Sequence, residues 1–394
     1  PPYPGGRPAL NVDEAVRRGE IKCYWVGGCN PVLTTLRAEA FEGALIERTA
    51  PVRAALERTK GKPAGERVVE IVEALKGGGM FLITQDIYMT ATARHAHLVL
   101  PAAQWGETNL TSINGERRLR LYERFMDPPG EAIPDWAIMA RFAQRLNALY
   151  LEDRNPLQAN KFLDYDWRSD EDVFIHARYQ YSGRAGDPME GYAGITYELL
   201  RELGSNGIQT PVRIVNGVPS GTVRLHEDGR FDTPSGKARF IPAPQPWPGY
   251  GATFKRQREK YRFWVNNGRT NHIWQTLYHH RLIPFHRDHN PLPHLEMHPG
   301  DAAGLGIASG DMVELSNDVG TVRAMAVITD AVKPGHTFML FGQPRGAVGD
   351  LVSDHVDPDT TIPYYKGAWA DIRRVGPKPA IAKAVSFLPQ NVAQ

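Results

Sequence analysis

Polar and glycine residues follow two apolar, strand-like runs, Ile21–Val26 and Met80–Thr84. The residues concerned are Gly28, Asn30, Gln85, Asp86 and Thr90. In a parallel sheet, ligands bind outside the carboxyl ends of the strands, where glycine lets the backbone approach a phosphate. A carboxylate there accepts hydrogen bonds from the amino-imino edge of guanine or from a ribose hydroxyl. On spacing alone, simple tight turns explain the pattern at least as well.

A second group of candidate residues follows the strand-like run that ends at Leu100. It comprises Gly106 and the segment Asn114–Arg118, in which Asn114 and Arg117 are the candidate ligand contacts. Arginine beside glycine suits a pyrophosphate or a pterin, because the planar guanidinium donates two parallel hydrogen bonds. Taken alone, a solvated basic turn is the simpler interpretation.

A third group lies in one loop, directly after the predicted strand Tyr261–Val265. Its candidate binding residues are Asn267, Gly268, Arg269, Trp274 and Gln275. Amide and guanidinium groups in one loop offer both donors and acceptors to a polar heterocycle. An ordinary polar loop is an equally good interpretation.

Six histidines lie within twenty residues, but they do not follow a metal-ligand spacing. They are His279, His280, His286, His289, His294 and His298. A polar loop is the better interpretation, and we predict no metal ligand and no catalytic side chain in the chain. The two cysteines, Cys23 and Cys29, cannot supply a four-cysteine iron–sulfur cluster, and we expect them to be buried structural thiols.

The order of predicted elements gives the fold class. Residues 1–13 are expected to be an interior loop, because the opening PPYPGG has no initiator Met and no signal sequence, as in a fragment. Strands and helices alternate over residues 14–160, which predicts a parallel α/β domain. Residues 161–255 form an irregular connecting region with a β-hairpin at Asp228-Gly229. Short strands and glycine turns over 256–394 predict a small β-barrel.

Composition excludes several classes of protein. The chain has 46 Lys+Arg and 44 Asp+Glu, so charge gives no reason to propose a nucleic-acid or membrane-surface partner. It has no apolar run long enough to span a bilayer.

Several motifs in order resemble the molybdopterin oxidoreductase (dimethyl-sulfoxide-reductase) family. Gln85–Thr90, continuing to Pro101, is similar to the family's third domain, and Asp301–Val313 is similar to its C-terminal barrel. Ile362–Gly367 resembles the motif that closes the barrel, which adds Tyr365 and Lys366 to the candidate cofactor contacts. The resemblance implies an incomplete α/β parallel-sheet domain followed by a six-stranded double-psi-type β-barrel. It also implies that Asp86 and Thr90 contact the guanosine end of the cofactor.

Within that family, the chain is most similar to the large subunits of the arsenite oxidase branch. The resemblance implies a molybdenum bis(molybdopterin guanine dinucleotide) cofactor and oxidation of arsenite to arsenate by oxygen-atom transfer. It further implies an iron–sulfur cluster in a preceding N-terminal part, a small Rieske-type iron–sulfur subunit, a cytochrome-like electron acceptor and a periplasmic location. The chain alone is expected to be inactive. Iodate reductase or another oxyanion oxidoreductase, and a non-catalytic scaffold subunit, are the alternatives.

Overall fold

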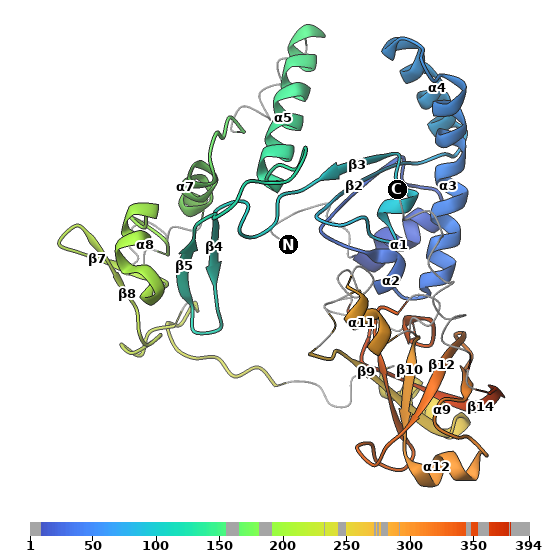
Figure 1. The fold of residues 1–394 in the computed structure, drawn as a ribbon. Helices are drawn as coiled ribbons and strands as arrows, with labels where there is room; N and C mark the ends of the chain where they lie inside the picture. Colours follow the sequence, from blue (N-terminus) through green and yellow to red (C-terminus); the bar gives the residue numbers. More distant parts are fainter. Residues whose placement is uncertain are drawn as a thin grey trace. The chain divides into compact units, whose positions relative to one another are not determined.

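The computed structural model forms two compact units. One contains Pro1–Val99 and Pro244–Gln394, and the other contains Leu100–Ala243 (Figure 1). The structure describes residues 9–154, 165–180, 191–231, 233–242, 250–271, 273, 276, 283–290, 292–343, 348–353, 362–377 and 379. Residues 1–8 of the predicted opening loop lie outside the described residues, and residues 9–13 belong to a helix and not to a loop.

A three-stranded sheet, in the order β1-β2-β3, begins the first unit. Its strands are β1 (Cys23–Gly27), β2 (Phe81–Asp86) and β3 (Leu98–Pro101). β1 and β2 are parallel, with Gly27 opposite Gln85, so both strands end at the same edge of the sheet. The predicted parallel sheet is confirmed. The predicted burial of the two cysteines is wrong: Cys23 opens an edge strand and Cys29 lies in the loop after it, and both are exposed.

Four α-helices and one 3-10 helix accompany this sheet. They are α1 (Ala9–Arg17), α2 (Pro31–Thr34), α3 (Ala38–Arg58), α4 (Ala64–Lys76) and η1 (Ala93–His95). The core of this part joins Phe41 and Leu45 of α3 to Met80 and Leu82, all with no exposed surface. α3 is the longest of these helices, with 21 residues. α4 runs alongside α3 in Figure 1 and buries none of its own residues.

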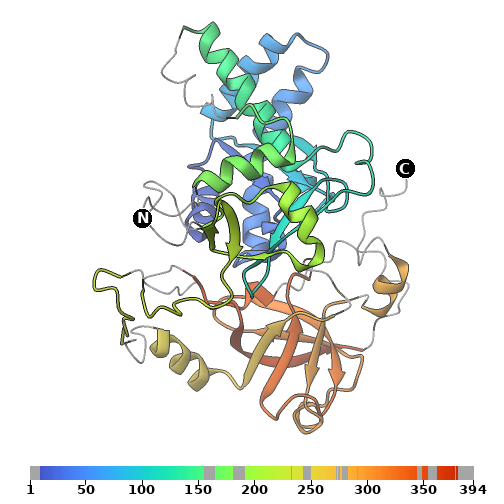
Figure 2. The ribbon, with the colours of Figure 1, turned by 90° about the vertical axis from the view of Figure 1, so that its left-hand side faces the viewer.

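The C-terminal part of the first unit is a closed six-stranded barrel, in the order β10-β12-β11-β14-β9-β13 (Figure 2). Its strands are β9 (Phe263–Gly268), β10 (His294–Met297), β11 (Met312–Ser316), β12 (Thr321–Ile328), β13 (His336–Leu340) and β14 (Gly367–Gly376). The β9–β13 and β10–β12 pairs are parallel and the others are antiparallel. The predicted barrel is confirmed.

Side chains at every second position of the strands point inward and fill the interior of the barrel. Phe263 and Val265 of β9 pack there with Leu295, Val313 and Met339, each at most 1% exposed. Short helices flank the strands: α9 (Tyr250–Lys260), α11 (Pro284–His289), α12 (Pro299–Gly304) and η4 (Val348–Asp350). A closed barrel leaves no edge strand, so its loops are held on a rigid base.

In its described residues, the second unit contains two small antiparallel sheets and three α-helices. The sheets are β4 (Leu110–Ile113), β5 (Arg118–Tyr122) and β6 (Ile208–Gln209), and β7 (Val212–Val215) with β8 (Val218–Gly221). The helices are α5 (Asp135–Glu152), α7 (Asp170–Gln180) and α8 (Tyr197–Leu203), followed by η3 (Gly204–Asn206).

Local interactions define one helix start and one hairpin in this unit. Thr196 caps α8, because its hydroxyl accepts a hydrogen bond from Leu199 N at 3.1 Å. The predicted hairpin at Asp228-Gly229 is an isolated turn without paired strands among the described residues. The hairpin is instead β7–β8, whose connecting residues Asn216 and Gly217 both have positive φ, as a type I′ turn requires.

Candidate cofactor-binding site

The backbone at Gly28 is uncovered at the carboxyl edge of the sheet. Its N–H donates to Gln85 O at 2.9 Å, so the loop after β1 is joined to the end of β2. Its φ is +60°, which favours glycine, and a Cβ at this position would meet no atom within 4 Å. The backbone is therefore accessible to a bulky group such as a phosphate.

Asp86 and Thr90 shape the segment that leaves β2. Both are buried, at 9% and 4% exposure. Asp86 Oδ1 accepts from Tyr88 N at 3.1 Å, and Thr90 Oγ1 accepts from Ala93 N at 3.1 Å, where η1 begins. These two bonds fix the turn that carries Asp86, so its carboxylate is held in a defined position at the strand end.

Asn30 is a structural anchor of the same edge. It is 3% exposed, and its Oδ1 accepts hydrogen bonds from Thr92 N at 3.1 Å and from Thr92 Oγ1 at 2.9 Å. Its Nδ2 donates to Thr276 Oγ1 at 3.3 Å, in the loop that follows β9. The side chain thus joins the sheet edge to a loop at the end of a barrel strand.

Loops from three barrel strands meet around Asn267. Its Nδ2 donates to Tyr365 O, and its backbone N–H donates to Lys366 O at 3.1 Å, just before β14 begins. Gly268 accepts from Phe341 N at 3.1 Å, after the end of β13. The structure therefore brings together Asn267, Gly268, Tyr365 and Lys366, which the sequence placed a hundred residues apart. Trp274 and Gln275 lie outside the described residues.

Arg269 lies on the surface of this cluster. Its guanidinium carbon is 5.3 Å from the centroid of the Phe341 ring, within the range of a cation–π contact. The side chain is exposed, so the ring orients the guanidinium while leaving it accessible to a ligand.

Further contacts hold the barrel against the sheet part of the same unit. Arg37 N donates to Gly349 O at 3.3 Å, and Glu39 N donates to Asp350 Oδ1 at 3.4 Å. Burial raises the pKa of Asp350. Burial also raises the pKa of Tyr365, and the Asp13 carboxylate of α1 adds to the rise. Residues of the sheet edge and of the barrel loops therefore belong to one packed assembly.

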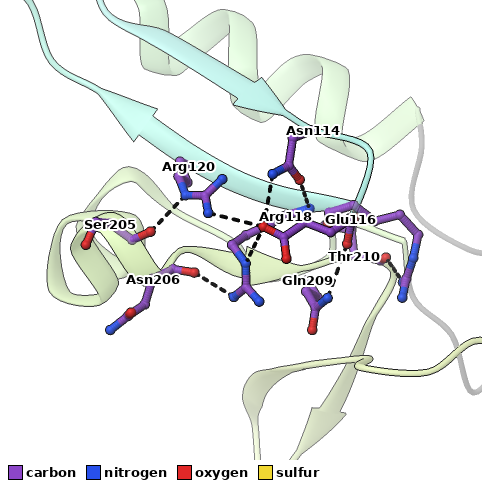
Figure 3. Close-up of polar contacts among 9 residues, drawn as sticks. Asn114, Glu116, Arg118, Arg120, Ser205, Asn206, Gln209 and Thr210 are labelled. Atoms are coloured by element: carbon purple, nitrogen blue, oxygen red, sulfur yellow. Dashed lines mark hydrogen bonds and ion pairs between the residues drawn. The ribbon is translucent and has the colours of Figure 1, made fainter.

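In the second unit, Asn114 and Glu116 organise a polar turn before β5 (Figure 3). Asn114 Nδ2 donates to Glu116 Oε1 at 2.9 Å, and Arg118 Nε donates to the same oxygen at 3.1 Å. Arg120 Nη2 also reaches it, at 3.3 Å, while Arg120 Nε donates to Ser205 O at 2.8 Å. These donors, with the Asn114 amide contributing most, lower the pKa of Glu116 to about 2.

Arg117 points into its own unit. Its φ is +61°, and its guanidinium donates to Thr210 O and, at 3.1 Å each, to Thr222 O and Val223 O. Both terminal nitrogens of the guanidinium, Nη1 and Nη2, therefore donate to backbone carbonyl groups. Arg117 has a structural role that the sequence did not reveal. A direct cofactor contact by Arg117 stays a prediction.

Gly106 has a conformational role in the same unit. Its φ is +95°, and a Cβ there would lie 2.6 Å from the Phe125 ring. Its carbonyl accepts hydrogen bonds from Phe125 N and Met126 N at 2.9 and 3.2 Å. Glycine at this position is therefore explained by close packing, and a role in cofactor binding stays a prediction.

The histidine-rich segment is only partly a loop. His294 lies in barrel strand β10, where burial lowers its pKa, and His298 caps α12 by accepting from Gly300 N at 3.1 Å. His286 and His289 belong to α11, whereas His279 and His280 lie outside the described residues. In the part of the chain that the structure describes, no group of His, Cys, Asp or Glu could hold a metal ion.

Two stretches of the chain match known protein families. Residues 66–145, which include β2 and Asp86, match the family described as molybdopterin oxidoreductase. Residues 263–369, which run from β9 into β14, match the molydopterin dinucleotide binding domain. The arsenite oxidase subunit AioA of Herminiimonas arsenicoxydans is 42% identical over 393 residues, or 98% of this chain. The chain belongs to the molybdopterin oxidoreductase family.

Other members of the family align over most of the chain. The iodate reductase subunit IdrA of Denitromonas iodatirespirans is 31% identical over 96% of the chain. The alignments cover 47% of the arsenite oxidase subunit and 47% of this iodate reductase subunit, so the chain spans about half the length of the curated relatives it matches. The family resemblance of the motifs is thereby confirmed.

A solved structure shares the fold. Acetylene hydratase from Pelobacter acetylenicus matches with a TM-score of 0.57 and 17% identity, covering 92% of this chain and 46% of that one. Among the described helices of our structure, none is long and apolar enough to cross a bilayer.

Proposed function

We propose that this chain binds a molybdopterin guanine dinucleotide in the large subunit of an enzyme that oxidises arsenite to arsenate. The observation that carries the proposal is the 42% identity to an arsenite oxidase subunit over 98% of the chain. That alignment includes both the polar edge of the sheet and the loops of the barrel.

The chemistry of the described residues fits such a group. The space beside the Gly28 backbone is open, because a Cβ at this position would contact no atom. The buried Asp86 carboxylate, at the end of the next strand, is a suitable hydrogen-bond acceptor for guanine. In the loop after β9, the exposed Arg269 guanidinium is held over Phe341. A planar guanidinium can both stack on a pterin and donate to a pyrophosphate.

The residues of this chain bind and orient the cofactor, which supplies oxygen-atom transfer when bound. Asp86, Gln85 and Thr90 form the guanosine side, and Asn267, Gly268, Arg269 and Lys366 form the barrel side. Asn30 holds the two sides together through Thr276. Trp274, Gln275, Tyr365, Gly106, Asn114 and Arg117 belong to the proposed contact set as well.

Other features of the whole enzyme belong to the same proposal. They are an iron–sulfur cluster elsewhere in the large subunit, a small Rieske-type subunit, a cytochrome-like acceptor and a periplasmic location. Iodate reduction is the second candidate, favoured by the 31% identity to iodate reductase subunits over 96% and 99% of the chain.

The test is a comparison of two activities in the whole purified enzyme, together with its molybdenum and pterin content. We expect both molybdenum and pterin, and dye reduction that depends on arsenite. Iodate-dependent dye oxidation without arsenite activity would transfer the assignment to the second candidate. Absence of molybdenum and pterin would overturn both and favour a scaffold role.

A further inference from the structure

A groove on the outer face of the barrel is lined by none of the proposed cofactor contacts. It has a volume of about 400 Å³ and is lined by side chains of β9, β10 and β13 and by residues 331–333. Asn266 pairs with Phe338, and Phe338 pairs with Glu296, so these three side chains form a row across adjacent strands. The volume is within the range of small-ligand sites.

The side chains that line the groove are different from the proposed cofactor contacts. His336 and Lys333 line it at the start of β13, whereas Arg269 stacks on Phe341, just after the end of that strand. Neighbouring strand positions point to opposite faces, so Asn266 is exposed on the outer face while Asn267 is buried.

Two aromatic side chains form rigid walls. The Trp264 indole lies so close to Gly367 that a Cβ there would overlap it, and it packs edge-on against Trp369 at 5.4 Å between centroids. The Phe338 ring is held against Gly268, where a Cβ would lie 2.9 Å away. Both rings are thus positioned before any ligand arrives.

Glu296 supplies a negative charge to the groove. It is half-buried on the outer face of β10, and burial raises the pKa of its carboxyl. Among the residues that the structure describes, it has no hydrogen bond or ion pair through its side chain, and Lys333, which lines the same groove, has no ion pair. A partly desolvated carboxylate without a partner is costly, and a cation placed beside it removes that cost.

We propose that this groove binds an organic cation, an alkylguanidinium or alkylammonium group, through Glu296 and the faces of Trp264 and Phe338. The carboxylate forms charge-assisted hydrogen bonds to the cation, and the aromatic rings attract it through their quadrupoles. The group belongs either to a small free amine or to a basic side chain of a protein partner.

Three probes separate these sources. They are agmatine, a blocked pentapeptide with arginine at its centre, and the same peptide with citrulline, which keeps the shape but lacks the charge. Binding to the purified protein is measured by titration calorimetry and by tryptophan fluorescence, since Trp264 lines the groove. We expect saturable binding of agmatine, the arginine peptide or both, and at least about tenfold weaker binding of the citrulline peptide.

Glu296→Gln and Asp330→Asn form a matched pair of variants. Both remove one negative charge near the groove, but Asp330 is not part of its lining. Glu296→Gln is expected to weaken binding about tenfold or more without changing Tm, and Asp330→Asn by less than about twofold. Lys333→Gln should tighten binding, because it removes a competing positive charge.

Binding of agmatine alone would identify a small amine as the source, and binding of the arginine peptide alone would identify a protein side chain. Either result supports the site. The proposal is overturned if neither probe binds saturably, if the citrulline peptide binds as well as the arginine peptide, or if Glu296→Gln leaves affinity unchanged.

Discussion

Asn30 and Thr276 are 246 positions apart, and Asn30 Nδ2 donates to Thr276 Oγ1 at 3.3 Å. The Oδ1 atom of the same amide accepts two hydrogen bonds from Thr92. One buried side chain therefore joins the loop after β1, the segment after β2 and a loop of the barrel. This amide therefore links the two proposed sides of the cofactor site, in addition to the contacts of η4 with the start of α3.

Asn30→Ala is expected to lower the free energy of unfolding by about 1–3 kcal/mol, because buried donors lose their partner. Thr276→Val removes only one of these bonds and should cost about 1 kcal/mol. Denaturant unfolding of both single variants and the double variant gives the coupling energy. Strictly additive effects would show that the two residues do not interact in solution.

Asp86→Asn is expected to reduce the pterin content of the whole enzyme while preserving the fold. The amide oxygen can still accept from Tyr88 N, but the charge that favours the guanine edge is lost. A hydrogen bond to a charged group contributes about 1.5–3 kcal/mol, so loading should be partial. Molybdenum and pterin assays check this, with Asp153→Asn at the exposed end of α5 as control. Full loading of the Asp86 variant contradicts the assignment.

Arg269→Lys is expected to impair turnover far more than stability. Lysine keeps the positive charge, but it loses the planar fork that can stack on a pterin and donate twice. The measurements are arsenite turnover per molybdenum, molybdenum content and Tm. Wild-type values for all three would make Arg269 an ordinary surface residue, which would contribute only about 0–1 kcal/mol through any ion pair.

Glu116→Gln is expected to make the free energy of unfolding fall less steeply as the pH is lowered. The pKa of Glu116 is lowered from 4.5 to about 2, chiefly by Asn114 and Arg118. A lowered pKa stabilises the fold above the unfolded value, so this contribution is lost as the pH falls from about 4.5 towards 2. Urea unfolding across that pH range should show a smaller slope in the variant. Glu131→Gln, at an exposed position, serves as the control; equal slopes in both variants would refute the explanation.

Gly106→Ala is expected to destabilise the second unit by about 1–3 kcal/mol, because of its positive φ and the overlap with Phe125. Adding Phe125→Ala removes the overlap but not the backbone strain, so it should restore stability only in part. Thermal unfolding of the single and double variants measures the two contributions. An unchanged Tm in Gly106→Ala would show that neither constraint operates.

Alternation of side chains explains which barrel strands could be predicted. The apolar patterns of Asp311–Ser316, Val322–Ile328 and Thr337–Phe341 predict strands, and β11, β12 and β13 begin and end within one residue of these ranges. β10 and β14 were not located. The segment His294–Met297 alternates outward polar and inward apolar positions, but its histidines favoured a loop interpretation. A period of two with apolar Leu295 and Met297 was the signal that could have identified the strand.

The candidate site was harder to predict, because the positions of its side chains depend on partners that are far away in the sequence. The glycine and Asp at the ends of β1 and β2 follow from the rule for parallel sheets. The carbonyl groups that bind Arg117 lie 93 to 106 positions further along the chain, and nothing in the local sequence indicates them. Similarly, the exposure of Cys23 follows from its place on an edge strand, which only the sheet order reveals.

The discontinuity of the first unit has a consequence for biosynthesis. The chain leaves this unit after Val99 and returns at Pro244, so its sheet part emerges from the ribosome long before its barrel part. The bond between Glu39 N and Asp350 Oδ1 spans 311 positions, and it can close only after the whole intervening segment has been translated. Until then, the surface of α3 that receives η4 is exposed to solvent, because the segment that covers it has not yet been made.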